Sequence, residues 1–204
     1  MPPYQAILFD FDGVLADTEP VHFQCWAEVL KPLGIHVDWP TFSKYCIGIP
    51  DRQAVEFFCH RNDPPVDLET AWAELGRKQQ IFRARTLAAP PISQEMVDFL
   101  KSLTGFKLAV VTASVRSEIE PLLERAGVRD CFGALVCRED VEHTKPAPDP
   151  YLTAARQLGV TTALVVEDSD AGAASGNAAG FEVLRVRGPA EVPARVLARI
   201  IDFR

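Results

Sequence analysis

Residues 6–19 read AILFDFDGVLADTE, an apolar run that ends at Asp10, with a second carboxylate at Asp12 and glycine at position 13. The run predicts a short buried strand that delivers two aspartates to a sharp turn. Because side chains alternate along a strand, Asp10 and Asp12 can point the same way while Phe11 packs on the opposite face. One carboxylate could then attack an electrophile while the other moves a proton. The plainer alternative is a strand ending in a polar loop, where Asp and Gly are common in any case.

The composition of the 204-residue chain is that of an acidic globular protein. Hydrophobic residues make up 48% of it, enough for one sizeable core and a small second domain. The net charge of −7 at pH 7 offers no general attraction for nucleic acid or anionic membranes, so we expect neither as a partner. No apolar run approaches a membrane-spanning length, and the opening MPPYQ lacks the features of a signal peptide. We expect a cytoplasmic monomer.

Short apolar runs alternate with helical patterns along most of the chain. Beyond the first run, strands are expected at 107–111, 134–136, 163–166 and 182–186, and helices between them at 117–126, 149–158 and 171–179. This alternation predicts right-handed crossovers and an α/β fold, a doubly wound parallel sheet covered by helices on both faces. Gly127, Gly159 and Gly180 each follow a helical stretch, where a cap residue with left-handed backbone is favoured.

The alternation is interrupted by a helical insertion. Amphipathic patterns without a convincing strand cover 21–33, 51–61 and 68–85. Glu19-Pro20 marks the departure from the sheet pattern, and Pro90-Pro91 marks the return to it. We therefore expect a sheet domain made of residues 1–17 and 91–204, and a helical domain at 18–90.

Chemistry-bearing residues follow each of the next expected strands. In an open parallel sheet, ligands bind beyond the carboxyl ends of the strands. Val111-Thr112-Ala113-Ser114 offers hydroxyls and backbone N–H groups near a helix start, which suits an anion, although Thr112 and Ser114 are also ordinary capping residues. Lys145 lies in a proline-rich stretch after the third strand, where the alternative is a solvated surface charge. The fourth strand ends in Glu167-Asp168-Ser169-Asp170, which could equally be an acidic helix cap.

The predicted sheet gathers Asp10, Asp12, Glu167 and Asp168 at one edge. Ionised carboxylates in partly dry surroundings repel one another strongly unless a cation is present. With oxygen ligands only, Mg²⁺ is the cation that fits best. Magnesium, a lysine, a hydroxyl and exposed amides together form a clamp for a phosphoryl group. The expected partner is therefore a small phosphorylated metabolite.

Over essentially its whole length the chain resembles the haloacid dehalogenase superfamily. The segment Asp10-Phe11-Asp12-Gly13-Val14-Leu15 matches the first motif of that family, Thr112 the second, Lys145 the third and Glu167-Asp168 the fourth. The resemblance implies a Rossmann-like core, with the helical insertion in the place of the small α-helical cap. It is closest to the subfamily that contains β-phosphoglucomutase and the sugar-phosphate and phosphoglycolate phosphatases.

The resemblance also implies residue roles. Asp10 would be the nucleophile that forms an aspartyl-phosphate, and Asp12 would be the general acid and base. Thr112 and Lys145 would hold the phosphoryl oxygens. The implied Mg²⁺ ligands are the Asp10 carboxylate, the Asp12 backbone carbonyl, Asp168 and, directly or through water, Glu167. Further candidates for contact with the substrate are Ala113, Ser114 and Arg116 after the second strand, and His22 and Lys78 in the cap.

The second carboxylate, Asp12, distinguishes between dehalogenation and phosphoryl transfer as the reaction. Displacing halide from carbon leaves no alkoxide that needs a proton, whereas phosphate-ester cleavage needs a proton delivered and then removed. Phosphoryl transfer therefore fits better than dehalogenation. A binding protein on this fold would be expected to have lost Asp10, Asp12, Lys145 or Asp168, and the sequence has all four.

The choice between a phosphatase and a mutase depends on the cap. Gly48, His22 and Lys78 match the mutase, but the mutase has an arginine shortly after the cap glycine to hold a second phosphate. Here Asp51 stands at that place, with Arg52 one position further along. Because a mutase must bind a bisphosphate, the loss of this cation is costly. We therefore expect a phosphatase, with a β-phosphoglucomutase-type mutase as the alternative. A phosphonate-cleaving enzyme would need a Schiff-base lysine in the cap, for which Lys31 or Lys44 are candidates.

Overall fold

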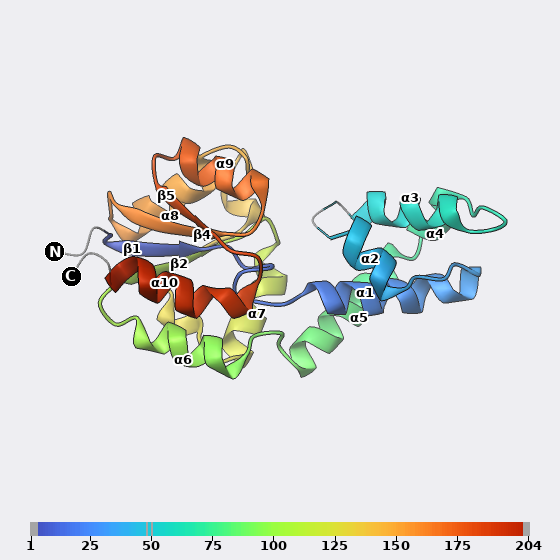
Figure 1. Ribbon diagram of the computed structural model, residues 1–204, viewed down its shortest axis with the longest axis horizontal. Coiled ribbons are helices and arrows are strands. Elements are labelled where there is room, and N and C mark those ends of the chain that lie inside the picture. Colours follow the sequence, from blue (N-terminus) through green and yellow to red (C-terminus); the bar gives the residue numbers. More distant parts are fainter. Residues whose placement is uncertain (1–3, 48, 50, 202–204) are drawn as a thin grey trace. The chain divides into compact units, whose positions relative to one another are not determined.

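The computed structural model describes residues 4–47, 49 and 51–201 and divides into two compact units (Figure 1). The sheet unit consists of Met1–Asp17 and Pro90–Arg204, and the helical unit is Thr18–Ala89. Within the described part of the chain, no helix has both the length and the apolar character needed to span a bilayer.

The sheet unit contains five parallel strands, as the apolar runs predict. They are β1 (Ala6–Phe9), β2 (Lys107–Val111), β3 (Ala134–Val136), β4 (Ala163–Glu167) and β5 (Glu182–Arg185). The strand order is β3-β2-β1-β4-β5 and every neighbouring pair is parallel. All residues of β1, β3 and β4 are buried, because helices cover the sheet on both faces. The predicted α/β fold class is confirmed.

Helices fill the connections between the strands and follow the last strand. They are α6 (Gln94–Ser102), α7 (Arg116–Arg125), α8 (Asp149–Leu158), α9 (Asp170–Ala178) and α10 (Val192–Ile201), with 3₁₀ turns η2 (Arg129–Cys131), η3 (Arg138–Asp140) and η4 (Pro189–Glu191). Helices α8 and α9 cover one face of the sheet, and α6 and α10 lie on the other (Figure 1). On that second face the ring of Phe99 in α6 meets Phe9 of β1 edge-on.

The helix ends follow ordinary capping chemistry. Gly127, Gly159 and Gly180 have positive φ values of 68°, 63° and 80°, which confirms their expected left-handed caps. The helical patterns named above did not include α6 and α10. Ser93 caps α6 by accepting a hydrogen bond from the Met96 N–H.

The helical unit consists of α1 (Glu19–Leu30), η1 (Lys31–Leu33), α2 (Trp39–Tyr45), α3 (Asp51–Arg61), α4 (Leu68–Trp72) and α5 (Leu75–Ala88). The single helix expected at 68–85 is two helices. The helix is interrupted at Ala73 and Glu74, where the sequence has no glycine or proline to predict an interruption. Helix α2 was missed because its seven residues are too few for a periodic pattern. Trp26, Phe42 and Phe58 lie in the core of this unit. Gly48 and Pro50 lie outside the described residues.

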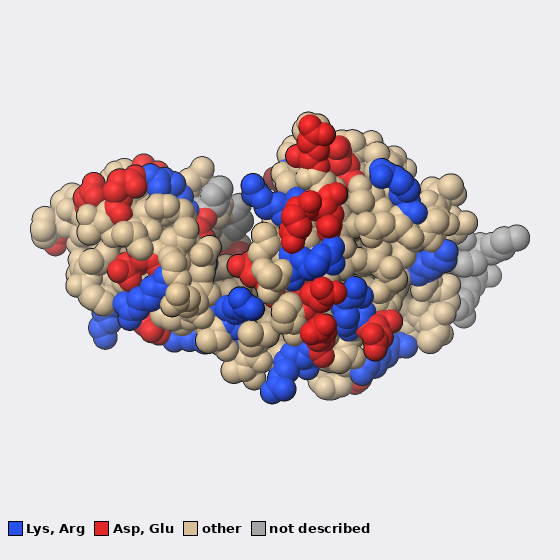
Figure 2. Space-filling model, turned by 180° about the vertical axis from the view of Figure 1, so that it is seen from behind, with Lys and Arg blue, Asp and Glu red and all other residues tan. Residues whose placement is uncertain are grey.

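Acidic and basic side chains are intermixed on the face of the molecule shown in Figure 2. With a net charge of −7, this face offers no continuous basic surface for a polyanion. A phosphate group must therefore be met by local groups inside a site.

Candidate active site

The sheet order brings the ends of three strands together. Strand β1 is central, with β2 and β4 as its neighbours. Phe9 is level with Val166 in the ladder, and the Asp10 N–H continues that ladder by donating to the Val166 carbonyl at 3.0 Å. Asp10 therefore lies at the centre of the carboxyl edge, the place where parallel sheets bind ligands.

The turn after β1 needs glycine at position 13 for two reasons. Gly13 has a φ of +71°, which is unfavourable for residues with a side chain. A Cβ built on Gly13 would also lie 2.1 Å from Oδ2 of Asp168, closer than any contact allows. The DFDG turn and the end of β4 are thus packed directly against each other, which brings the first and fourth motifs into one site.

Lys145 links the carboxyl ends of β1, β2 and β4. Its Nζ donates to Asp10 Oδ1 at 2.7 Å, to Glu167 Oε1 at 2.6 Å and to the Val111 carbonyl at 2.9 Å. These bonds engage all the N–H donors of an ammonium group. The side chain is 8% exposed and its Nζ lies 5.1 Å from the ring centroid of Tyr151. Lys145 is therefore a buried cation inside the site and not a surface charge.

Glu167 is fully buried, and its carboxylate is extensively hydrogen-bonded. Oε1 accepts from Lys145 and from the Tyr151 hydroxyl at 2.8 Å, and Oε2 accepts from the Asp168 N–H and from the N–H and hydroxyl of Ser169. A Cβ on Gly172 would lie 1.7 Å from Oε1, so the helix α9 backbone also approaches this group closely. Such a carboxylate suits the positioning of Lys145 better than direct metal ligation.

The carboxylates of the site carry more negative charge than their neighbours neutralise. Burial raises the pKa of Asp10 to about 8; Lys145 opposes this rise, while Glu167 and Asp12 add to it. Burial, followed by the charge of Glu167, raises the pKa of Asp168 to about 6. For Glu167 burial is the largest effect and acts upward, but the charge and hydrogen bond of Lys145 together with the hydrogen bonds of Tyr151 and Ser169 outweigh it, and the pKa is lowered.

These carboxylates suit a hard divalent cation. Oxygen atoms of Asp10, Glu167 and Asp168 lie within 4.8 Å of one another. The donors are all oxygen, which is the ligand type that Mg²⁺ prefers. Since Glu167 is already engaged by five hydrogen-bond donors, Asp10 and Asp168 are the carboxylates left for the metal.

The raised pKa of Asp10 predicts a pH-dependent stability in the absence of metal. Between its ordinary value of 3.8 and about 8, folded protein keeps a proton on Asp10 that the unfolded chain has released. The folded state therefore loses stability as pH rises through this window. Asp10→Asn removes that titration, so we expect the variant to gain stability relative to wild type between pH 5 and pH 8, by roughly a few kcal/mol at about 1.4 kcal/mol per pH unit.

Urea unfolding in EDTA at pH 5, 6, 7 and 8 measures this difference. Asp98→Asn, a change at an exposed carboxylate of α6, is the matched control. A stability difference between wild type and Asp10→Asn that is the same at every pH would contradict the prediction.

Asp12, Thr112 and Ser114 also come together. The Ser114 hydroxyl donates to Asp12 Oδ2 at 3.1 Å, and the Ser114 N–H donates to the Thr112 hydroxyl oxygen at 3.0 Å. Thr112 is buried and Ala113 is exposed. The Ser114 hydroxyl thus contacts the predicted general acid, and contact of Ser114 with phosphate stays a prediction.

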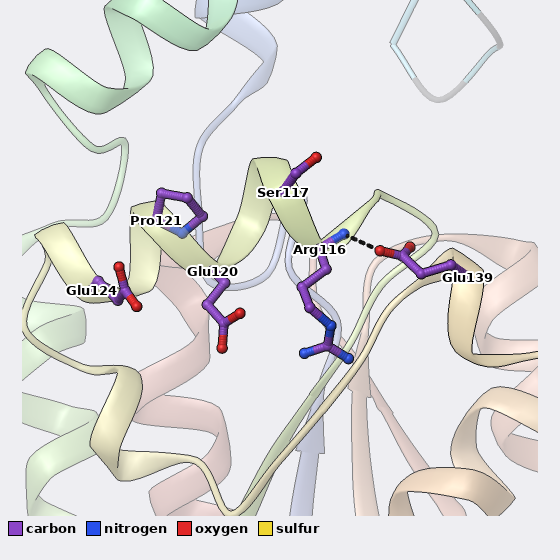
Figure 3. Close-up of a pocket in the computed structure, with 6 residues that line it drawn as sticks. All are labelled: Arg116, Ser117, Glu120, Pro121, Glu124 and Glu139. Atoms are coloured by element: carbon purple, nitrogen blue, oxygen red, sulfur yellow. Dashed lines mark hydrogen bonds between the residues drawn. The ribbon is translucent and has the colours of Figure 1, made fainter.

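The Arg116 guanidinium is bound by other groups of the protein. Its guanidinium donates to Asp140 Oδ2 at 2.6 Å and to the Leu135 carbonyl at 3.0 Å, while its backbone N–H donates to Glu139. It lines an open groove of about 420 Å³ on α7, together with Ser117, Glu120, Pro121, Glu124 and Glu139 (Figure 3). None of these other residues was predicted for the site. We therefore leave Arg116 out of the proposed phosphate site, because the Asp140 carboxylate and the Leu135 carbonyl already bind its guanidinium.

The two site residues predicted in the helical unit contact each other. Lys78 Nζ lies 2.7 Å from His22 Nδ1, and the Lys78 residue is 2% exposed. Its second partner is Asp51, at 2.7 Å from Oδ2. Asp51, which stands where a mutase would have a cation, is the anion that Lys78 binds.

Sequence reasoning missed Tyr151 and Arg185. Tyr151 donates to Glu167 from the first turn of α8, where no motif marks it. Arg185 is the last residue of β5 and donates to the backbone carbonyls of Asp168 and Ser169. Applying the strand-end rule to the fifth strand could have found Arg185.

Comparisons with known proteins identify the family of this chain. Residues 7–186 match the family model described as haloacid dehalogenase-like hydrolase. The chain is 34% identical over 188 residues to the fructose-1-phosphate phosphatase YqaB of Escherichia coli (strain K12). This match covers 90% of this chain and 97% of that protein. It is 28% identical over 180 residues to a phosphorylated carbohydrates phosphatase of Thermotoga maritima, covering 87% and 82% of the two chains. The crystal structure of CbbY from Rhodobacter sphaeroides in complex with phosphate has a TM-score of 0.67 at 26% identity, covering 91% of this chain and 87% of that one. The family resemblance seen in the motifs is confirmed, and the chain belongs to the haloacid dehalogenase-like hydrolases.

Proposed function

We propose that this protein is a Mg²⁺-dependent phosphatase that hydrolyses a small phosphomonoester, of the sugar-phosphate or phosphoglycolate type, through an aspartyl-phosphate on Asp10. The observation that carries the proposal is the contact of Lys145 with both Asp10 and Glu167 at the carboxyl edge of the central strand. The printed names of relatives that act on fructose 1-phosphate and on phosphorylated carbohydrates support the substrate class.

The proposed reaction uses two carboxylates in sequence. The Asp10 carboxylate attacks phosphorus, and the bond from phosphorus to the ester oxygen breaks. Asp12, oriented by Ser114, gives a proton to the leaving oxygen and then takes one from the water that attacks the aspartyl-phosphate. Inorganic phosphate leaves, and both carboxylates return to their starting state. Lys145 and the groups around Thr112 and Ala113 hold the phosphoryl oxygens.

The metal would be held by the carboxylates of Asp10 and Asp168 and by the Asp12 backbone carbonyl. When bound, Mg²⁺ lowers the repulsion between the Asp10 carboxylate and an anionic phosphate. In this proposal Glu167 is a positioning residue for Lys145 and reaches the metal at most through water. Arg185, which donates to the Asp168 carbonyl at 2.6 Å, supports the strand end that presents Asp168.

Contacts in the helical unit favour water as the phosphoryl acceptor. Arg52, which could have replaced the missing mutase arginine, bonds to Glu69 and lies 5.3 Å from the Trp72 ring centroid. Asp51 is bound to Lys78. Arg52 and Lys78 are thus each bound to a carboxylate, and neither cation is available for a second phosphate. This disfavours the mutase reaction. Lys31 and Lys44 are exposed, whereas Schiff-base lysines are activated by desolvation or by a neighbouring cation.

A phosphate-release assay tests the proposed function. We expect steady release from sugar phosphates, a loss of at least about 100-fold in EDTA, and recovery on addition of Mg²⁺, because uncompensated carboxylates repel the phosphate. β-Glucose 1-phosphate should be assayed for both phosphate release and isomerisation. Turnover that is insensitive to EDTA would refute the metal assignment. Isomerisation in the presence of glucose 1,6-bisphosphate that far exceeds hydrolysis would replace the phosphatase by the mutase.

A further inference from the structure

Tyr151 is a buried polar side chain to which the proposed reaction gives no role. It is the third residue of α8, it is 0% exposed, and its ring belongs to the apolar core on one face of the sheet, with Leu8, Val111 and Val165. A hydroxyl group in such surroundings is costly unless it is hydrogen-bonded. This one donates to Glu167 Oε1 at 2.8 Å. The packing of the ring and the direction of its hydroxyl are therefore both fixed.

Tyr151 bears the proton in its hydrogen bond with Glu167. Burial, followed by the charge of Glu167, raises the pKa of Tyr151 well above its ordinary value. The pKa of Glu167 is lowered, so this group is a carboxylate and can only accept. The phenol is therefore a permanent donor to Oε1.

Tyr151 also contacts Lys145, in two ways. The Lys145 ammonium lies 5.1 Å from the centroid of the Tyr151 ring, within the range of a cation–π interaction. The ammonium and the phenol also donate to the same oxygen, Glu167 Oε1, at 2.6 Å and 2.8 Å. Since a carboxylate oxygen has two lone pairs, these two donors saturate it. The hydroxyl thus limits how strongly Glu167 can hold the ammonium.

The balance between two carboxylates decides where the ammonium of Lys145 lies. Glu167 cannot turn, because its Oε2 is held by three donors from the two residues that follow it. Another N–H of Lys145 donates to Asp10 Oδ1 at 2.7 Å, which places the ammonium beside the carboxylate that the proposed reaction phosphorylates. Without the Tyr151 hydroxyl, Oε1 would have one donor and would hold the ammonium more strongly, at the expense of the bond to Asp10.

We propose that Tyr151 is a positioning residue for Lys145. Its ring and its hydroxyl hold the ammonium between Glu167 and Asp10, in the place from which it meets the phosphoryl group that is transferred to Asp10. The inference rests on the proposed phosphatase function. A donor that is displaced from the developing charge stabilises the transition state less, so the loss of the hydroxyl slows the reaction without touching the substrate.

Tyr151→Phe, which keeps the ring and removes the hydroxyl, tests the proposal. The measurement is kcat/KM for phosphate release from the sugar phosphate that wild type hydrolyses fastest. We expect a loss of about tenfold, because the support of Lys145 loses a hydrogen bond to a charged group.

Tyr4→Phe is the matched control. Tyr4 is also buried and its hydroxyl also donates to a carboxylate, Glu182 Oε2 at 2.6 Å. It precedes β1, whereas Asp10 follows that strand. The kcat/KM of Tyr4→Phe should therefore stay within about twofold of wild type.

A double-variant cycle shows whether Tyr151 acts through Lys145. Lys145→Met has no ammonium to position, so adding Tyr151→Phe to it should lower kcat/KM by less than about twofold. A further loss as large as the loss in wild type would overturn the proposal. If Lys145→Met is too slow to measure, inhibition by inorganic phosphate decides. Tyr151→Phe should raise that inhibition constant about fivefold and Tyr4→Phe should leave it unchanged, because Lys145 holds the phosphate oxygens. An unchanged constant in Tyr151→Phe would overturn the proposal.

A merely structural role for Tyr151 predicts a different pattern. Tyr151→Phe and Tyr4→Phe would then lower the urea midpoint alike and leave kcat/KM of the folded protein unchanged, which would overturn the proposal. A Tyr151→Phe protein that circular dichroism shows to be unfolded would overturn it as well. An active wild type whose kcat/KM does not change in Tyr151→Phe rejects only this inference, whereas a wild type that releases phosphate from no monoester rejects the proposed function.

Discussion

Asp10→Asn is expected to lower kcat/KM for phosphate release by at least about 10³-fold while the protein stays folded. The amide has almost the shape of the carboxylate but is a poor nucleophile, so no aspartyl-phosphate can form. Asp10 lies at the end of the central strand with its carboxylate against Lys145, so the change removes the reacting group and leaves the strand intact.

Three measurements belong to this test: phosphate release, circular dichroism, and mass spectrometry of protein quenched during turnover. Wild type should show a phosphorylated species that Asp10→Asn lacks. Asp98→Asn, the same change at an exposed position on α6, should keep full activity. Activity within tenfold of wild type in Asp10→Asn would refute the assignment of the nucleophile.

The second large effect is expected for Lys145→Met, which keeps most of the side-chain volume but removes the ammonium. Asp10 and Glu167 then remain buried without their shared cation. Breaking a buried ion pair by removing one partner costs about 3–5 kcal/mol. We expect a loss of stability of that order together with a loss of activity of about 10²–10³-fold.

Urea unfolding of the single and double variants separates charge from packing. Adding Glu167→Gln to Lys145→Met removes one orphaned carboxylate and should restore part of the lost stability. Lys107→Met is the matched control, because Lys107 donates to the Leu158 carbonyl and pairs with no carboxylate of the residues that the structure describes. A loss below about 1 kcal/mol in Lys145→Met would show that the buried carboxylates do not depend on the ammonium.

Local patterns predict those parts of the site whose positions follow from topology. Asp10, Thr112 and Glu167 were predicted together because parallel strands expose their carboxyl ends at one edge, and the strand order then makes them neighbours. Lys145 was predicted from its place in the proline-rich stretch after the third strand and from the third family motif. Its contact with both Asp10 and Glu167 depends on the path of the chain between β3 and α8, which no local pattern encodes.

Two side chains predicted to contact the substrate have protein partners in the structure, and their contact with substrate stays a prediction. Arg116 has a suitable charge and a suitable place in the sequence, but Asp140, 24 residues away, binds its guanidinium. Lys78 was expected to face the substrate, yet Asp51 and His22 hold its buried ammonium. In both cases a charge expected to meet a ligand is satisfied by a residue distant in sequence.

The sequence by itself determined the doubly wound α/β core, the helical insertion and the motif positions at the ends of β1, β2 and β4, because strand and helix periodicity, glycine and proline are local signals. The tertiary structure alone decided which charged side chains pair with one another and which of them are buried. It made Glu167 a buried acceptor for Lys145 and Tyr151, and it placed Asp51 over Lys78 as the exposed member of their pair. The physical reason is that desolvation and ion pairing depend on which residues meet in space, and a single sequence does not contain those distances.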